Sequence, residues 1–481
     1  MRDIPKSQIL RRIELENPWW TQQAVSPTYT QVAPRPYLKL FYPLVANRSV
    51  RRAPILMGPR RVGKTYLLHH CIQALLDEGV SAKQICYVSV DSPIYVNLPL
   101  ERFLDLYSEA TGISYLSEPT YFFFDEIQYL KNWEQHLKSI VDTFPLVQCT
   151  ASGSAAAALR MKSHESGAGR FTDFLLPPLT FYEYLNLMGV EEKLVYVERR
   201  GNDDYYGLHD VRSLNEHFVR YINYGGYPEV ALSGDIQANP ERFIKSDIID
   251  KVLLRDLPSL YGISDIQELN SLFTSLAFNT SQEIAPEELA KNSGVAKPTI
   301  KRYMEYLEAA FLIKVVHRVD ESVRYFKRAR NFKVYLTNPS LRAALFGAMS
   351  ADDESFGHLV ETGVFAQWFH SESQNLYYAR WKRGELDIVS LRPDQKVDWA
   401  VEVKWSDRLA RQPEAAMREL LAFCGKNNVR ELTVTTRTLI LDRTIGNVDV
   451  NFWPAALYAY AAGHSIINSK VLALSGKATV L

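Results

Sequence analysis

One stretch of the chain has glycine, lysine and threonine residues spaced as they would need to be to bind phosphate groups. An apolar run ends in the residues Gly58, Pro59, Arg60, Arg61, Val62, Gly63, Lys64 and Thr65. The two glycines bracket four residues, a spacing at which successive backbone N–H groups can curl around a polyphosphate. Lys64 would then reach the β and γ phosphates of ATP, and Thr65 would be a ligand of Mg²⁺. The alternative is a glycine-rich turn without function.

A nucleotide-binding loop needs a strand before it and a helix after it. Residues 54–57 are apolar, and residues 66–76 have helical spacing, so the positive end of that helix would face the anion. Further short apolar runs at 85–90, 121–124 and 147–151 alternate with helical segments. This alternation is typical of an α/β fold with a parallel sheet.

Two carboxylates, Asp125 and Glu126, follow the aromatic run 121–124. Ligands gather at the carboxyl ends of parallel strands, so we expect Asp125 to lie beside the loop and to hold Mg²⁺, directly or through water. Glu126 would orient and polarise the attacking water. In the alternative, the two acids cap the start of a helix.

The run 147–151 is followed by Ser152, Gly153 and Ser154. One of the two serine hydroxyls, with Ser152 preferred, is expected to sense the γ-phosphate. A plain turn explains the same residues.

Length and composition limit the class of protein. The 481 residues favour about three domains, and the net charge of zero means that nucleic acid would have to bind at local basic patches. The four cysteines lie far apart and are expected to be reduced core thiols. The start of the chain is polar and no apolar stretch of about 18 residues occurs, which predicts a cytoplasmic protein without a membrane span.

Changes in pattern along the chain divide it into five predicted parts. They are an N-terminal arm (1–48), a nucleotide-binding domain (49–185), a helical lid (186–275), a winged helix (276–333) and a C-terminal α/β domain (334–481).

A helix-turn-helix pattern occupies residues 286–304. Its second helix would turn apolar residues inward and leave four polar side chains at its N-terminal end, namely Lys297, Thr299, Lys301 and Arg302. A basic run follows and contains Arg324, Lys327, Arg328, Arg330 and Lys333. This pattern favours DNA contact, although a solvated basic hairpin or a protein-docking module would look the same.

Charged residues interrupt two apolar strands near the C-terminus. Alternation places Glu402 and Lys404 on one face of their strand, where Asp387 on the neighbouring strand can meet them. Burying such charges is unfavourable unless a metal ion or a full set of partners is present.

Several of these motifs together resemble the prokaryotic AAA+ ATPases of the archaeal-ATPase type. The resemblance rests on residues 58–65, 125–126, 150–154, 169–170, 177–185 and 225–228, and it spans nearly the whole chain. It implies an AAA+ fold with a lid, and it makes Arg170 a candidate arginine finger that stabilises charge on the γ-phosphoryl group. Arg170 as a surface arginine at a helix end is the alternative. Residues 150–154 read Thr-Ala-Ser-Gly-Ser, where relatives more often have Thr-Gly-Ser-Ser-Ser.

The same resemblance implies a PD-(D/E)XK nuclease fold for the C-terminal domain. It makes Asp387 and Glu402 ligands of a divalent metal, adds Glu361 from the apolar helix 358–369 to complete the shell, and gives Lys404 the role of holding or activating water. The alternative is a decayed nuclease core in which Glu402 and Lys404 form a buried salt bridge.

The sequence therefore predicts an ATP-hydrolysing enzyme that uses ATP and Mg²⁺ and acts on DNA, and it leaves assembly into a homo-oligomer open. The sequence leaves open whether the protein also cleaves DNA with the help of a metal ion. The rival hypothesis is an ATP-gated DNA-binding or protein-remodelling module with an inactive nuclease-like scaffold. A signalling switch that rarely turns over is a third class, which Glu126 disfavours.

Overall fold

The computed structural model describes residues 5–96, 98–153, 169–201, 203–323, 331–371 and 375–474. The chain forms two compact units. The first comprises Met1–Pro177 with Lys470–Leu481, and the second comprises Pro178–Ser469. Both units combine helices with a β-sheet, so the predicted α/β fold class is confirmed.

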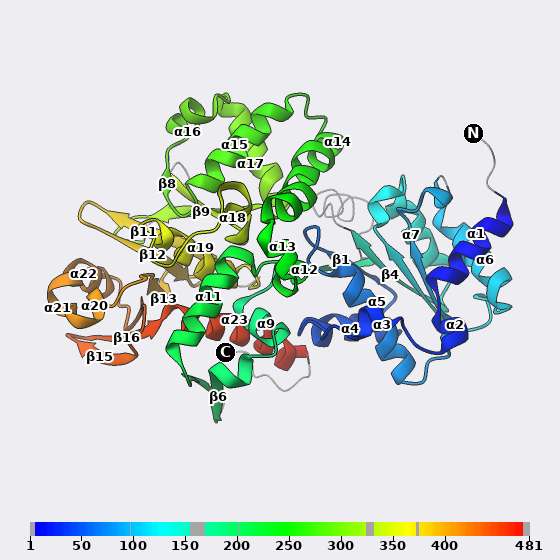
Figure 1. Cartoon of the computed structure of the whole chain (residues 1–481), viewed down its shortest axis with the longest axis horizontal. Coiled ribbons are helices and arrows are strands. Elements are labelled where there is room, and N and C mark those ends of the chain that lie inside the picture. The colour runs from blue at the N-terminus through cyan, green and yellow to red at the C-terminus, as the bar shows by residue number, and fades with distance from the viewer. Residues whose placement is uncertain are drawn as a thin grey trace. The chain divides into compact units, whose positions relative to one another are not determined.

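The first unit is built on a five-stranded parallel sheet with the order β2-β3-β4-β1-β5. Its strands are β1 (Ala53–Met57), β2 (Ile85–Ser89), β3 (Thr120–Asp125), β4 (Val147–Gly153) and β5 (Phe171–Leu175). The strands β1, β3 and β4 are buried along their whole length, and helices lie on both faces of the sheet (Figure 1). Four of these strands coincide with the four runs predicted from the sequence, which read as continuous apolar segments because both faces are covered.

Helices α1 to α7 also belong to the first unit. They are α1 (Lys6–Glu16), α2 (Trp19–Gln22), α3 (Pro27–Thr30), α4 (Leu38–Ala46), α5 (Lys64–Asp77), α6 (Leu100–Thr111) and α7 (Trp133–Thr143), with short 3₁₀ turns η1 (Ala82–Gln84), η2 (Pro93–Tyr95) and η3 (Ile127–Tyr129). The carboxyl ends of β1 and β3 lead directly into the loop before α5 and into η3. The predicted phosphate loop and the predicted carboxylates therefore both lie at the carboxyl-terminal end of the sheet.

The N-terminal arm covers the exposed edge of β2. The side chain of Asn17 accepts a hydrogen bond from the backbone N–H of Tyr87 (2.6 Å) and donates one to its carbonyl (2.8 Å). The indole N–H groups of Trp19 and Trp20 both donate to the carbonyl of Ile85, at 3.0 and 2.7 Å. An edge strand left bare would offer unpaired backbone groups to other chains, and this arm satisfies them.

The second unit begins with a mostly helical region. Its elements are α9 (Phe181–Leu187), α10 (Glu191–Leu194), β6 (Val195–Arg200), β7 (Asp203–Leu208), α11 (Val211–Tyr224), α12 (Pro228–Leu232), α13 (Gly234–Ala238), the π-helices η4 (Glu241–Asp250) and η5 (Val252–Asp256), and α14 (Leu257–Tyr261). Thr180 and Glu183 form a reciprocal capping box that fixes the start of α9. The antiparallel pair β6 and β7 adds a hairpin to the region 186–275, which was expected to be mostly helical with a break at 201–204.

Three helices and three strands follow in a compact order. They are α15 (Ile266–Phe278), β8 (Glu283–Ile284), α16 (Pro286–Ser293), α17 (Lys297–Ala309), β9 (Ile313–Val319) and β10 (Phe332–Leu336). The strand β10 pairs antiparallel with both β8 and β9. The predicted boundaries at 185/186, 275/276 and 333/334 fall inside α9, α15 and β10.

A nine-stranded sheet organises the rest of the second unit, in the order β15-β16-β14-β13-β12-β11-β9-β10-β8. The added strands are β11 (Asn375–Trp381), β12 (Gly384–Leu391), β13 (Val397–Glu402), β14 (Glu431–Thr436), β15 (Leu441–Ile445) and β16 (Val448–Pro454). The strand β9 pairs with β11, so the sheet runs without a break from the predicted winged helix into the predicted C-terminal domain.

The remaining helices are α18 (Ser340–Phe346), α19 (Phe356–Trp368), α20 (Arg408–Arg411), α21 (Pro413–Ala416), α22 (Arg418–Lys426) and α23 (Ala455–Leu474). A hydrophobic core that includes Phe423, Leu432 and Phe452 packs β12, β14 and β16 against α22. The four cysteines are buried and free, as predicted.

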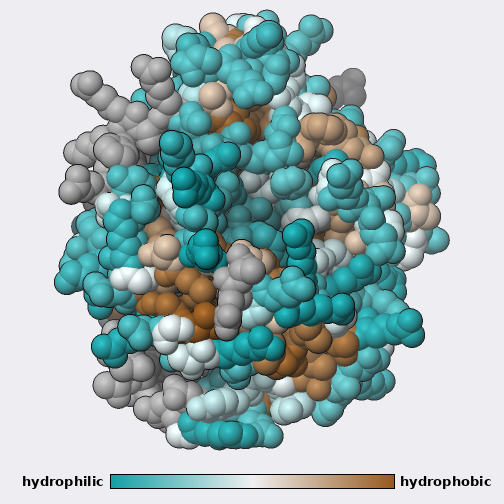
Figure 2. Space-filling view, turned by 90° about the vertical axis from the view of Figure 1, so that its left-hand side faces the viewer, coloured by the Kyte–Doolittle hydropathy of each residue, from teal (hydrophilic) through white to brown (hydrophobic). Residues whose placement is uncertain are grey.

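One face of the molecule is mostly hydrophilic, with hydrophobic patches that are separate from one another (Figure 2). Within the described ranges, no helix has the length and apolar character needed to cross a membrane.

Candidate functional site

The phosphate loop ends at Gly63, which has a left-handed backbone (φ 93°) and directly precedes α5. Glycine adopts this conformation without strain because it lacks a Cβ atom. Lys64 is buried, and its ammonium group donates hydrogen bonds to the carbonyls of Gly58 (3.1 Å) and Pro59 (2.9 Å). The loop thus folds around the lysine side chain at the N-terminal end of a helix, where an anion is favoured.

Gly58 has a second, purely steric requirement. A Cβ atom at this position would lie 2.2 Å from the carbonyl oxygen of Leu176, which follows β5. The Leu176 N–H donates to the carbonyl of Met57 (2.7 Å), so this backbone segment is held in place. Any side chain at residue 58 would displace the start of the loop.

Asp125 lies at the centre of a hydrogen-bond network beside the loop. Its Oδ2 atom accepts hydrogen bonds from the hydroxyls of Thr65 (2.6 Å) and Tyr87 (2.7 Å), and its Oδ1 atom accepts one from Ser152. Burial and then the neighbouring Glu126 raise the pKa of Asp125, and the three hydroxyl donors oppose that rise. The hydroxyl and carboxylate oxygens of Thr65 and Asp125 are of the type that Mg²⁺ prefers, so the residues fit this ion.

Ser152 connects the two acidic residues. Its hydroxyl donates to Asp125 and accepts a hydrogen bond from the backbone N–H of Glu126 (3.2 Å). Glu126 has a left-handed backbone (φ 56°), and its carboxylate accepts a hydrogen bond from the side chain of Gln128. The structure brings Ser152, Asp125 and Glu126 together as expected, whereas Ser154 lies outside the described residues.

The structure places Arg170 away from this site within its own chain. The Arg170 carbonyl accepts a hydrogen bond from the N–H of Ala53 at the start of β1, whereas the phosphate loop follows the end of β1. Its guanidinium pairs with Asp142 at 2.9 Å and is 44% exposed. An exposed pair of this kind contributes little to stability.

A cavity of about 510 Å³ adjoins Asp125. Besides Thr65 and Asp125 it is lined by residues of the N-terminal arm, including Arg12, Glu16 and Tyr29. These arm residues were not predicted to belong to the site.

Two further aromatic residues near the site, His69 and Tyr87, were missed. His69 donates from Nδ1 to the carbonyl of Thr65 (2.8 Å) and stacks on Tyr29, with ring centroids 3.7 Å apart. Burial lowers the pKa of His69 to about 4. Tyr87 could have been noticed only as a polar group on β2, the strand next to the one that ends in Asp125.

The second helix of the predicted helix-turn-helix pattern has the expected faces. Ile300, Met304 and Leu307 are buried, whereas Lys301 and Arg302 are exposed. Lys297 is also exposed and forms an ion pair of 2.8 Å with Glu287 on α16, and Thr299 is half-buried. The basic residues at 324–330 lie outside the described residues.

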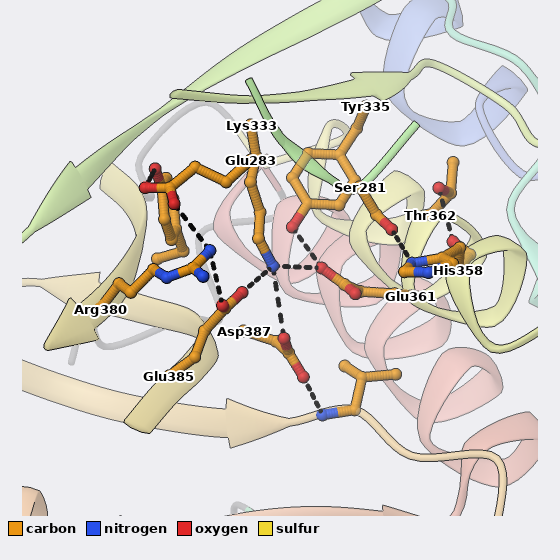
Figure 3. Close-up of polar contacts among 12 residues, drawn as sticks. Ser281, Glu283, Lys333, Tyr335, His358, Glu361, Thr362, Arg380, Glu385 and Asp387 are labelled. Atoms are coloured by element: carbon orange, nitrogen blue, oxygen red, sulfur yellow. Dashed lines mark hydrogen bonds and ion pairs between the residues drawn. The ribbon is translucent and has the colours of Figure 1, made fainter. Parts of the chain in front are cut away.

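The prediction of an exposed basic run was wrong for its last residue, Lys333, which is buried. The side chain is 3% exposed, and its ammonium nitrogen lies among three carboxylates (Figure 3). The partner oxygens belong to Glu385 (2.6 Å), Glu361 (2.9 Å) and Asp387 (3.4 Å). In β10, side chains alternate between two faces, and Lys333 is on the face that packs against α19 with Tyr335.

The convergence predicted for Asp387, Glu402 and Lys404 is present. The Lys404 ammonium lies 2.6 Å from Glu402 and 3.3 Å from the Oδ2 atom of Asp387. Oδ2 also accepts a hydrogen bond from the backbone N–H of Val403 (2.9 Å). Among the described residues, none forms a hydrogen bond with the buried Oε2 atom of Glu402.

The charges of this cluster shift one another's pKa values. Burial would raise the pKa of Asp387, but Lys404 and Lys333 lower it below its usual value. Burial, followed by the charge of Asp387, raises the pKa of Glu361 to about 7 and that of Glu402 to about 8. Burial opposes the charge of both lysines, and the surrounding acidic groups nevertheless raise the pKa of each.

These residues do not fit a divalent metal ion. In the part of the chain that the structure describes, no three His, Cys, Asp or Glu side chains are arranged to hold one. Glu361 and Asp387, two of the three expected ligands, both lie against the Lys333 ammonium. The ligand set that the nuclease resemblance implied is therefore occupied by ion pairs within the protein.

Family models match separate parts of this chain. Residues 50–185 match a family model described as an AAA domain, and residues 215–352 match a domain of unknown function, DUF8612. An uncharacterized protein of Haemophilus influenzae is 23% identical over 347 residues, which cover 71% of this chain and 80% of the relative. An uncharacterized protein of Methanocaldococcus jannaschii is 24% identical over 359 residues, covering 72% and 75%.

Among solved structures, the Walker-type ATPase of Pyrococcus abyssi aligns at a TM-score of 0.36 and 14% identity, over 64% of this chain and 94% of that chain. The identification of residues 50–185 as an AAA domain rests on the family match, and the geometry around Lys64, Thr65 and Asp125 agrees with it.

Proposed function

We propose that this protein, an ATPase with an AAA domain in its first unit, couples ATP binding and hydrolysis to the contact of its second unit with DNA. The ATP part of the proposal rests on one observation above all. Thr65 of the phosphate loop, Asp125 of β3 and Ser152 of β4 meet within hydrogen-bonding distance on one edge of a parallel sheet. That edge is where phosphates and Mg²⁺ bind in sheets of this type.

Each residue of the site has a distinct role in this proposal. The backbone N–H groups of residues 60–63 and the ammonium of Lys64 bind the phosphates, for which the lysine exchanges its present carbonyl partners. Thr65 and Asp125 hold Mg²⁺, which neutralises charge on the phosphates when bound. Glu126 orients and polarises the water. The Ser152 hydroxyl holds Asp125 and the backbone of Glu126 in position through its two hydrogen bonds.

Arg170 is proposed to act on the nucleotide of a neighbouring subunit in a homo-oligomer. Its exposure and its position at the start of β1 support this, because it lies at the opposite end of that strand from the loop it would otherwise serve. An arginine supplied from another chain can increase turnover by about 10³ to 10⁵.

DNA contact is assigned to the segment 266–336, which we interpret as a winged helix. The order of its elements, helix, strand, two helices and two strands, supports this interpretation. Within it, α17 presents Lys301 and Arg302 to solvent near its N-terminal end, the part of a recognition helix that meets the major groove. Protein docking is the alternative use of such a module.

Salt-dependent DNA binding tests this part of the proposal. Fluorescence anisotropy with a labelled duplex would compare the wild type with the double variant Lys301→Glu/Arg302→Glu over a series of salt concentrations. We expect weaker binding by the variant and a salt slope reduced by about 0.9 for each phosphate contact removed.

A matched control reverses two exposed charges on the turn between β12 and β13, Arg392→Glu/Lys396→Glu. It changes the net charge by the same amount away from α17. Equal affinity of the α17 variant and the wild type at every salt concentration would instead assign α17 to protein docking.

Metal-dependent DNA cleavage is left out of the proposal. Its expected ligands Glu361 and Asp387 are paired with Lys333, whose ammonium lies where a metal ion would have to bind. The open alternative of a nuclease-like scaffold without cleavage agrees better with this geometry.

A further inference from the structure

The ammonium group of Lys333 is surrounded by carboxylates from separate elements of the second unit. Lys333 lies on β10, Glu361 on α19, and Glu385 and Asp387 on β12 (Figure 3). Burying a lysine and several acids is unfavourable unless their geometry compensates for the lost hydration. All three distances, from 2.6 to 3.4 Å, lie within the range of direct ion pairs.

Other groups complete the coordination of these carboxylates. The hydroxyl of Tyr335 donates to the same Glu361 oxygen that faces Lys333, at 2.7 Å. Glu385 also pairs with Arg380 (3.3 Å), which pairs in turn with Glu283 of β8 (2.6 Å). The network thus extends from α19 to the edge of the nine-stranded sheet.

Asp387 is engaged on both of its oxygen atoms. Oδ1 faces Lys333, whereas Oδ2 faces Lys404 and accepts the N–H of Val403. A metal ion would need direct contact with such an oxygen at about 2.0 to 2.6 Å. It would therefore have to displace at least one of the two lysines.

We propose that Lys333 is the built-in cation of this cluster, so that its ammonium takes the position of a divalent metal and ties β10 to α19 and β12. The wild-type protein then binds no divalent ion at Glu361 and Asp387. The cluster serves as an internal connection between the strands next to α17 and the C-terminal part of the same sheet. Loss of the ammonium converts the same carboxylates into a metal site.

Binding of Mn²⁺ to the nucleotide-free protein tests this proposal, with bound ions counted by the loss of the free Mn²⁺ signal in electron paramagnetic resonance. The proteins compared are the wild type, Asp387→Asn, Lys333→Met and Lys333→Met/Asp387→Asn. Lys396→Met serves as the control, because Lys396 is exposed and its ammonium forms an ion pair with the exposed Asp394. Thermal unfolding with and without Mn²⁺ is a second readout.

We expect the wild type, Asp387→Asn and Lys396→Met to bind equal amounts of Mn²⁺. Lys333→Met should bind one additional ion and unfold at a higher temperature in its presence, and the double variant should lose both effects. A wild-type ion that Asp387→Asn loses would overturn the proposal. So would a folded Lys333→Met variant that gains no ion.

The comparison of the wild type with Asp387→Asn does not depend on Lys333→Met being stable. If that variant fails to fold with or without Mn²⁺, equal binding by the first two proteins supports the built-in cation, and unequal binding refutes it.

Discussion

Tyr87→Phe should weaken the binding of Mg²⁺ and ATP although Tyr87 touches neither in our proposal. Its hydroxyl donates at 2.7 Å to the Oδ2 atom of Asp125, which also accepts from Thr65 at 2.6 Å. A hydrogen bond to a charged group is worth about 1.5 to 3 kcal/mol. Losing it removes one of the groups that keep the carboxylate ionised, so the pKa of Asp125 should rise further.

Groups that orient a metal ligand in this way typically contribute about 10- to 100-fold to metal affinity. We therefore expect a loss of that size in the affinity for Mg²⁺ with a non-hydrolysable ATP analogue, measured by isothermal titration calorimetry. In EDTA, where only the phosphate loop contributes, the two proteins should differ little.

Tyr107→Phe is the matched control, because the Tyr107 hydroxyl donates to the carbonyl of Lys83 at the same distance, 2.7 Å, in the same unit. It should affect stability and leave Mg²⁺-dependent affinity unchanged. Wild-type affinity of Tyr87→Phe, or an equal loss in Tyr107→Phe, would refute the role given to the Asp125 network.

Two other changes probe the packing of the loop and the neighbouring helix. Gly58→Ala should cost about 1 to 3 kcal/mol in stability and weaken ATP binding, since the new Cβ would lie 2.2 Å from a backbone oxygen; unchanged calorimetric ATP affinity would contradict this. His69 has a folded pKa of about 4 against an ordinary 6.5, so the unfolded chain binds the proton more readily. The free energy of unfolding should therefore fall as the pH drops from 6.5 towards 4, by up to about 3 kcal/mol, and stay level above 6.5 as far as His69 is concerned. Chemical denaturation across this range should show a smaller pH dependence for His69→Gln, and an equal dependence would rule out His69 as its source.

The convergence of Lys64, Thr65 and Asp125 was predictable from the sequence because the parts are local. The glycine spacing of 58–63, with Lys64 and Thr65, is a single continuous motif, and Asp125 follows a strand whose apolar character is plain. The support around Asp125 was not predictable in the same way. Tyr87 comes from another strand and meets Asp125 only through the parallel pairing of β2 and β3.

Lys333 shows a different limit of sequence reasoning. Near Arg324 to Arg330 it looked like the last member of a solvated basic run, whereas burial on β10 depends on how α19 packs against that strand. The available signal was that Lys333 and Tyr335 are two residues apart in an apolar strand, which places both side chains on the same face. The convergence of Asp387, Glu402 and Lys404 was predictable because adjacent strands with strict alternation bring such groups together.

The hairpin β6 and β7 was missed for a local reason. Residues 195–200 mix valine, tyrosine and charged residues without a clear period, and the turn at 201–204 suits a helix break as well as a hairpin.

The most direct test of the central claim is steady-state ATP hydrolysis by the wild type, Lys64→Ala and Glu126→Gln, together with ATP affinity for each. We predict that Lys64→Ala loses ATP binding or turnover. Glu126→Gln should keep its affinity and lose about 10²- to 10⁴-fold in kcat, the usual contribution of a positioned general base. Turnover by Glu126→Gln at the wild-type rate would contradict the role of that carboxylate and the mechanism built on it.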